Sequence, residues 1–210
     1  MYIPAHFEET RVDVLHALIR QHPLGMLVVS GAQGLDANHV PFEIDPDPAP
    51  YGTLRCHVAR ANPVWQSLST AASTMVVFRG AEAYVSPSWY ASKQQNGKVV
   101  PTWNYVAVHA YGSPRAISDV AWLRRLVESL TDRHEGQRVD RWRVGDAPGE
   151  YIDKLLTAIV GIEMPISRLI GKWKLSQNRP PVDRTGVVTG LRREADGSGV
   201  DLARTMEKLR

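Results

Sequence analysis

The sequence predicts a mainly β protein with helices at its periphery, an α+β fold whose strands are largely antiparallel. Many short runs rich in β-branched and aromatic residues are separated by breakers that contain Gly, Pro or Asn. These connections are tight, which favours a barrel or sandwich over a doubly wound parallel sheet. Because no internal repeat or long linker divides the chain, we expect one β-barrel domain.

Three stretches have the apolar spacing of amphipathic helices. Thr10 and Ser118 are placed to cap the first two, and Pro148 stands at a favoured first-turn position of the third. The predicted helices cover approximately residues 11–21, 119–134 and 149–157.

The predicted strands are short, and turn residues bound them. The turn over 31–34 makes a hairpin of the first two strands, and Gly80-Ala81 separates the fourth from the fifth. The predicted strands cover 25–30, 38–44, 53–59, 74–79, 82–86, 102–112 and 158–164. We expect residues 1–180 to form the barrel domain with its helices, and 181–210 to form a basic, partly helical C-terminal extension.

The composition excludes several classes of protein. Hydrophobic residues make up 43% and charged residues 22% of the 210 residues, as in an average globular chain. No apolar run reaches the roughly 18–20 residues that a membrane helix needs, and no basic start followed by an apolar stretch marks a signal peptide. The single cysteine, Cys56, cannot form an internal disulfide or a thiolate-rich metal site. We therefore expect a cytoplasmic protein without a membrane segment.

Positive charge is concentrated near the C-terminus. Residues 163–210 hold 10 Lys and Arg against 6 Asp and Glu, whereas residues 1–162 are almost balanced. Such a surplus favours an anionic partner, either a phosphate-bearing cofactor or nucleic acid. A solvated surface with scattered arginines explains it equally well.

Common catalytic motifs are missing from the sequence. It contains no GxGxxG after a strand, no GxxxxGK[ST], no GxSxG and no HExxH. No His and Cys cluster has zinc spacing, so we expect no metal site. Cys56 lies in mid-strand, where a packing role is favoured over a reactive thiolate. No catalytic residue is assigned.

Three polar clusters lie on predicted strands or at their ends: 38–42, 57–63 and 101–105. Arg60 and Asn62 follow a strand exit, where a guanidinium can hold a phosphate bidentately with help from turn N–H groups. Trp89, Tyr90, Trp103 and Tyr105 could line a flat heteroaromatic ligand, although core packing explains such residues as often.

Six segments, in order, resemble the PaiB family, which is described as FMN-binding negative transcriptional regulators. The segments are Met1–Phe7, His39–Phe42, His57–Pro63, Tyr84–Tyr90, Val100–Tyr105 and Lys174–Arg179. The resemblance implies an FMN-binding split β-barrel, similar to pyridoxamine-phosphate oxidases and flavin reductases. It also implies a homodimer with the flavin at the subunit interface.

The resemblance further implies a set of cofactor-binding residues. Arg60 would hold the FMN phosphate, supported by His57 and Asn62, and the strand at 38–44 would run beside the isoalloxazine ring. Its contacts would come from His39, Val40 and Pro41, and the partner chain would add Trp103, Asn104, Tyr105, Lys174, Gln177 and Arg179.

Three functions remain open on this basis. The first is flavin binding with PaiB-type negative regulation of transcription, in which DNA is a further partner. The second is a flavin-dependent oxidoreductase, reductase- or oxidase-like, with no DNA-binding role, since flavin itself carries the hydride chemistry. The third is a catabolic or haem-handling enzyme on the same barrel. The sequence provides little support for DNA binding, because no helix–turn–helix pair with a short turn is evident.

Overall fold

The computed structural model describes residues 1–31, 34–194 and 197–208. Nine strands of these residues form one sheet in the order β3-β2-β6-β7-β9-β5-β4, and β1 and β8 also pair with β9. The registers of β2 with β3 and β6, and of β9 with β5, are antiparallel. The strands are β1 Glu8–Glu9, β2 Leu24–Gly31, β3 Gly34–Pro41, β4 Glu43–Asp45, β5 Thr53–Ala59, β6 Ser73–Val85, β7 Thr102–Gly112, β8 Arg115–Ile117 and β9 Ile159–Lys174.

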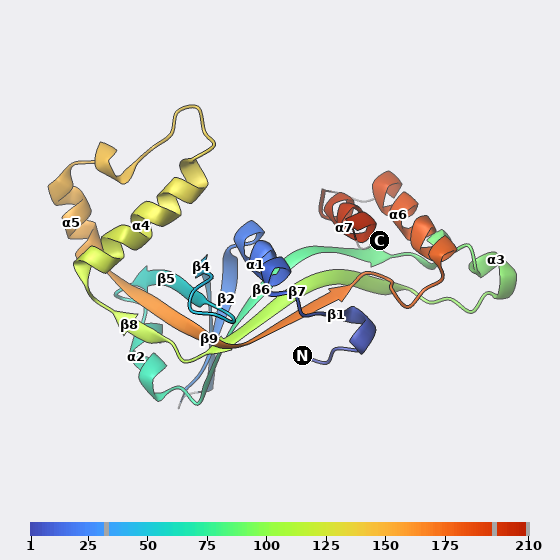
Figure 1. The fold of residues 1–210 in the computed structure, drawn as a ribbon, viewed down its shortest axis with the longest axis horizontal. Coiled ribbons are helices and arrows are strands. Elements are labelled where there is room, and N and C mark those ends of the chain that lie inside the picture. The colour runs from blue at the N-terminus through green and yellow to red at the C-terminus, as the bar shows by residue number, and fades with distance from the viewer. Residues whose placement is uncertain (32–33, 195–196, 209–210) are drawn as a thin grey trace. The chain divides into compact units, whose positions relative to one another are not determined.

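The helices connect or follow these strands. Helices α4 and α5 lie side by side, and so do α6 and α7 (Figure 1). No helix among the described residues is long and apolar enough to cross a membrane. The α-helices are α1 Val12–Gln21, α2 Val64–Ser67, α3 Lys93–Asn96, α4 Val120–Glu135, α5 Gly149–Thr157, α6 Pro181–Glu194 and α7 Gly197–Lys208.

The chain divides into two compact units. The first unit consists of Met1–Leu18, Arg79–His109 and Ile170–Arg210, and the second of Ile19–Phe78 and Ala110–Leu169. The long strands β6, β7 and β9 each contribute residues to both units.

In the second unit, strand β5 shows how alternation builds the core. Leu54, Cys56 and Val58 are buried on one face, and Arg55 and His57 lie on the other. Helix α4 packs its apolar stripe against the face of β5 that bears Arg55 and His57. This packing explains why the apolar residues of α4 repeat at helical spacing. The approach is close. A Cβ at Gly161, the register partner of His57, would collide with the Trp122 ring of α4.

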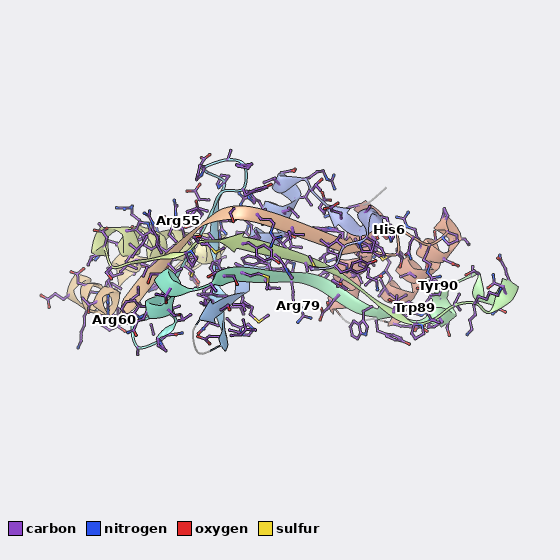
Figure 2. All side chains as sticks on the ribbon, turned by 90° about the horizontal axis from the view of Figure 1, so that it is seen from below. His6, Arg55, Arg60, Arg79, Trp89 and Tyr90 are labelled. Atoms are coloured by element: carbon purple, nitrogen blue, oxygen red, sulfur yellow. The ribbon has the colours of Figure 1, made fainter. Side chains whose placement is uncertain are left out.

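In the first unit, helix α6 is fixed to the short 3-10 turn Pro87–Trp89 and to Ser92, which follows that turn. The buried Asp183 carboxylate accepts hydrogen bonds from the backbone N–H and hydroxyl of Ser92, at 2.9 and 2.7 Å. Trp89, which is labelled in Figure 2, packs on Gly190 and donates its indole N–H to Glu194 at 3.1 Å. A Cβ at Gly190 would lie 2.6 Å from Cε2 of Trp89, so only glycine allows this contact.

Several predicted elements coincide with observed ones. Helices α1, α4 and α5 occupy the three predicted helical stretches, and the runs at 53–59 and 102–112 are β5 and β7. Helix α4 is capped by Asp119 rather than Ser118, since the Asp119 carboxylate accepts from the Trp122 N–H at 2.7 Å. The predicted turn over 31–34 includes residues 32–33, which lie outside the described part of the chain.

The strand predictions are wrong in extent at three places. The run 38–44 covers the end of β3 and the start of β4, which are separate strands interrupted at Phe42. The runs 74–79 and 82–86 form one strand, β6, because the Gly80-Ala81 pair continues the extended backbone and Ala81 is buried in it. The run 158–164 continues to Lys174 as β9, which carries residues of both units. Helices α6 and α7 fill most of the predicted C-terminal extension; residues 195–196 and 209–210 of that extension are not described.

Candidate FMN site

Arg60 lies in the exposed turn between β5 and α2. Its Nε donates to the Thr157 carbonyl at 2.8 Å and its Nη2 donates to the Ile159 carbonyl at 2.9 Å. The Arg60 backbone N–H also donates to Ala158, at 2.8 Å. The guanidinium is therefore fixed across the junction of α5 and β9, where the negative end of the α5 dipole favours a cation (Figure 2).

A fixed guanidinium can still bind an anion. Arginine has five N–H donors in a planar fork, and the two carbonyl contacts of Arg60 use one hydrogen on Nε and one on Nη2. The donors that remain form a fork that suits a phosphate or carboxylate. The carbonyl contacts thus hold Arg60 in place without exhausting its donors.

Asn62 joins the first two predicted clusters. Its amide nitrogen donates to the Asn38 side-chain oxygen on β3 at 2.7 Å, and its oxygen accepts from the Val64 N–H at 3.0 Å. The second bond fixes the start of the short helix α2. The turn that bears Arg60 is therefore held beside strand β3.

Strand β3 presents alternate residues to two environments. His39 and Pro41 are exposed, whereas the Val40 side chain is 5% exposed and lies in the core. Val40 pairs with Gly25 of β2, where a Cβ would collide with Phe78 and Val76. A ligand on the exposed face of β3 could touch the side chains of His39 and Pro41, but only the backbone of Val40.

His57 and Cys56 occupy apolar surroundings. Burial lowers the pKa of His57, and its Nδ1 has no hydrogen-bond partner among the described residues. No hydrogen bond in that part of the chain joins His57 to Arg60 or Asn62, and its face of β5 is the one covered by α4. Burial raises the pKa of the Cys56 thiol, which suits the predicted packing role.

The first unit brings together Trp103, Tyr105 and two lysines. The Lys174 ammonium donates to the Thr102 hydroxyl at 2.5 Å and to the Trp103 carbonyl at 2.6 Å. Lys172 is only 8% exposed, and its ammonium lies 5.3 Å from the centre of the Tyr105 ring. Neither lysine has a salt bridge in the described chain, and burial, with the charges of Lys172 and Arg179, lowers the pKa of Lys174.

Exposed aromatic rings accompany these lysines. Trp103 is 56% exposed and makes an edge-to-face contact with Tyr84, which is 48% exposed, at a ring separation of 6.2 Å. The site prediction did not include Lys172 or Tyr84. Lys172 lies two positions before Lys174 and therefore on the same face of the strand, which could have indicated it. Tyr84 begins one of the PaiB-like segments, which could have indicated that residue.

Two other predicted site residues, Asn104 and Gln177, are engaged within the first unit. Asn104 is 1% exposed and donates to the Ser176 hydroxyl at 2.9 Å. Ser176 has a φ of 62°, a left-handed conformation that is uncommon outside glycine. Gln177 closes the same turn by accepting from the Leu175 N–H at 2.7 Å and donating to the Trp173 carbonyl at 2.5 Å.

Arg179, Trp89 and Tyr90 lie where helix α6 packs on the rest of the first unit. The Arg179 guanidinium lies 4.9 Å from the centre of the Tyr90 ring, and Tyr90 is 2% exposed. Trp89 packs on Gly190. Trp89 and Tyr90 therefore serve in packing, as the sequence allows, and do not line a ligand site.

The comparison with known families identifies the chain. A family model described as "Putative FMN-binding domain" matches residues 1–168. The chain belongs to this family of FMN-binding domains. Its cofactor is therefore FMN, as predicted.

Relatives of this family member match nearly its whole length. The uncharacterized protein AN0679 of Emericella nidulans is 34% identical over 97% of this chain and 95% of its own. The Protease synthase and sporulation protein PAI 2 of Bacillus subtilis is 29% identical over 99% of this chain and 97% of its own. The resemblance to the PaiB family is thus confirmed, and these matches extend through the C-terminal helices that the family model leaves out.

A solved structure shares the fold. The FAD and heme binding protein from Mycobacterium smegmatis has a TM-score of 0.60, at 18% sequence identity, over 80% of this chain and 73% of that one. The predicted fold class, an antiparallel split β-barrel with peripheral helices, is confirmed.

Proposed function

We propose that this chain is an FMN-binding protein of the PaiB type, in which each flavin lies at a homodimer interface with its phosphate on Arg60. One observation carries the proposal. Two carbonyls hold the Arg60 guanidinium in an exposed turn, beside strand β3, with donors to spare. His39 and Pro41 offer the exposed strand face for the ring, and Asn62 fixes the turn. When bound, FMN supplies hydride and electron transfer.

The other half of the proposed site comes from the partner chain. Trp103 and Tyr105 of the partner subunit would stack on the ring system, and Lys174 of the partner subunit would add positive charge. Support comes from the exposed aromatic pair of Trp103 and Tyr84, whose ring centres lie 6.2 Å apart. Asn104 is buried, and Gln177 and Arg179 are half-buried and already engaged by other residues of the first unit. Their proposed role is therefore to hold the turn that follows Lys174 in position.

A flavin titration combined with a mass measurement tests this proposal. We expect the purified protein to bind one FMN per chain, seen as quenching of flavin fluorescence, and to have the mass of a dimer by light scattering. A monomer that binds no FMN would refute it.

The regulatory part of the proposed function rests on the resemblance to the PaiB family, which is described as negative transcriptional regulators. A flavin-dependent oxidoreductase without a DNA-binding role is the second candidate, and one observation favours it over direct DNA binding. Three arginines of α6 and α7 already pair with carboxylates, whereas DNA binding needs cations free for phosphates. The pairs are Arg192–Glu207, Arg193–Glu194 and Arg204–Asp201.

Two assays separate these candidates. Specific binding of a DNA fragment from the protein's own genomic locus, retained at moderate salt, would support regulation. Oxidation of NADH or NADPH that depends on added FMN would support the oxidoreductase. We further propose a cytoplasmic location, consistent with one buried, unpaired cysteine.

A further inference from the structure

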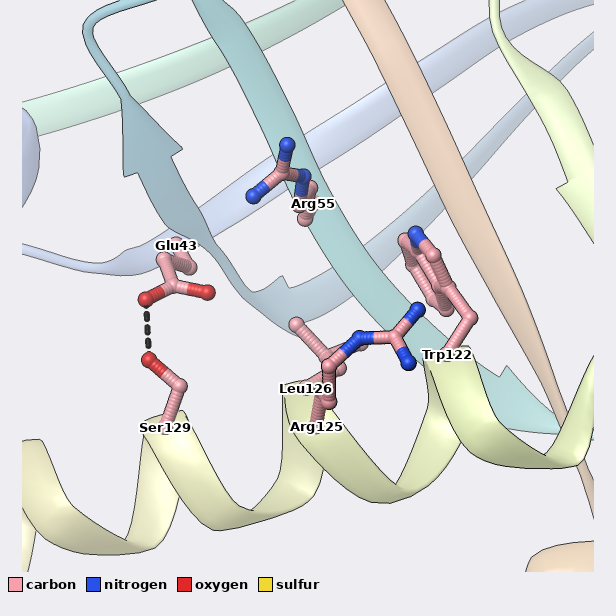
Figure 3. Close-up of a pocket in the computed structure, with 6 residues that line it drawn as sticks. All are labelled: Glu43, Arg55, Trp122, Arg125, Leu126 and Ser129. Carbon is pink, nitrogen blue, oxygen red and sulfur yellow. Dashed lines mark hydrogen bonds between the residues drawn. The ribbon is translucent and has the colours of Figure 1, made fainter.

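A cavity of about 210 Å³ lies in the second unit, between α4 and the strands β4 and β5. Figure 3 shows Glu43 and Ser129 at one end of it, and Trp122 with the Arg125 side chain at the other. Its lining residues are Glu43, Arg55, Trp122, Arg125, Leu126 and Ser129. None of them takes part in the proposed FMN site.

The charged groups beside this cavity form ion pairs with one another, except for two. Arg55 is engaged by Asp45 at 2.8 Å and by Glu163 at 3.3 Å, and Glu163 also binds Arg115 at 2.5 Å. Burial alone would raise the pKa of Glu163, but its two arginine partners hold that pKa below the usual range. All four groups of this network are therefore charged, and their charges cancel. Because Arg55 is already paired with two carboxylates, it has little capacity for a ligand anion.

Arg125 and Glu43 are the unmatched pair. Within the described ranges, Arg125 forms no salt bridge or hydrogen bond, and Glu43 accepts a hydrogen bond from the Ser129 hydroxyl but has no cation partner. A guanidinium fork binds a carboxylate bidentately, and a carboxylate accepts from an ammonium group. The complementary ligand therefore carries one negative and one positive charge.

The size and the wall of the cavity narrow the ligand further. Its volume is below the roughly 300–1,000 Å³ of sites for drug-sized molecules and corresponds to about seven waters at ~30 Å³ each. The Trp122 ring and the buried Leu126 side chain give it an apolar wall. The ligand is thus a small zwitterion with an apolar part.

We propose that this cavity binds an α-amino acid with an aliphatic side chain. Its carboxylate lies on Arg125, its ammonium group on Glu43, and its side chain on Trp122 and Leu126. The site is independent of the FMN site and does not require the proposed function.

Calorimetric titration with L-leucine and its two half-charged analogues tests this proposal. 4-Methylpentanoate lacks the ammonium group and 3-methylbutylamine lacks the carboxylate. Leucine is expected to bind at least about ten-fold more tightly than either, the scale of one charged hydrogen bond. Arg125→Gln should weaken leucine binding by about the same factor and leave the binding of 3-methylbutylamine unaffected. Glu43→Gln should also weaken leucine binding by about that factor, but it should leave the binding of 4-methylpentanoate unaffected.

Arg124→Gln is the matched control. Arg124 precedes Arg125 on the same helix but pairs with Asp153 at 2.6 Å, and it does not line the cavity. Leucine should raise the thermal midpoint of the wild type and of Arg124→Gln, but not of Arg125→Gln. The proposal is overturned if leucine binds no better than its analogues, if Arg125→Gln binds leucine normally, or if no leucine binding is measurable in wild-type protein.

Discussion

Replacing Arg60 separates its two roles, the anchoring of the β5–α2 turn and the binding of the FMN phosphate. Arg60→Ala removes two hydrogen bonds to the carbonyls of Thr157 and Ile159. Because the side chain is exposed, we expect this loss to cost only about 1 kcal/mol of unfolding free energy. The lost phosphate contact should weaken FMN binding by about 1–3 kcal/mol, or roughly 5- to 150-fold.

Riboflavin is the internal control for this experiment, because it has the same ring and ribityl chain as FMN but no phosphate. If Arg60 binds the phosphate, Arg60→Ala lowers the affinity for FMN and leaves that for riboflavin little changed. Both affinities are measured by quenching of flavin fluorescence. Arg204→Ala removes another exposed, paired arginine and should leave both unaffected. An unchanged ratio of FMN to riboflavin affinity in Arg60→Ala would refute the phosphate assignment.

Three further predictions concern the packing and charges of the fold. Gly190→Ala should lower the free energy of unfolding by about 1–3 kcal/mol in urea denaturation, since the new methyl group meets the Trp89 ring; Gly149→Ala, with open space, should not, and a stable Gly190→Ala would show that Trp89 moves freely. The Glu163 pKa is depressed below its ordinary value of 4.5, so its ion pairs stabilise the fold above that pH and the contribution is lost as the pH falls through the folded-state pKa. The stability difference between wild type and Glu163→Gln should therefore shrink on acidification, and a difference that is constant with pH would contradict this. Cys56, fully buried with a raised pKa, should react with a thiol reagent only in urea, and rapid reaction in native buffer would contradict its burial.

The sequence predicted what local periodicity determines. Strands β5 and β7 and helices α1, α4 and α5 each show a two- or 3.6-residue pattern over their whole length. The division at Gly80-Ala81 failed because a glycine inside a strand resembles a turn until tertiary pairing holds it extended. Helix α6 was hidden for a related reason. Its buried face includes Gly190, which becomes an apolar contact only when Trp89 lies on it.

For the candidate site, the sequence points to individual residues, whose roles stay predictions, but not to their arrangement. The strand exit pointed to Arg60. The bond between Asn62 and Asn38, which lie 24 positions apart in the sequence, then joins two of the polar clusters. No local pattern indicates that the Arg60 guanidinium is fixed by two carbonyls. Alternation places Trp103 and Asn104 on opposite faces of β7, but it does not say that the face of Asn104 is the buried one.

A mixed dimer tests the shared flavin site most directly. Arg60→Ala and Trp103→Ala chains are co-expressed with different tags, and the heterodimer is isolated by sequential affinity steps. If each site takes Arg60 from one chain and Trp103 from the other, one site in the heterodimer is intact. It should then bind about half as much FMN as the wild type, at wild-type affinity, while each variant homodimer binds weakly. A heterodimer without any site of wild-type affinity would contradict the shared site.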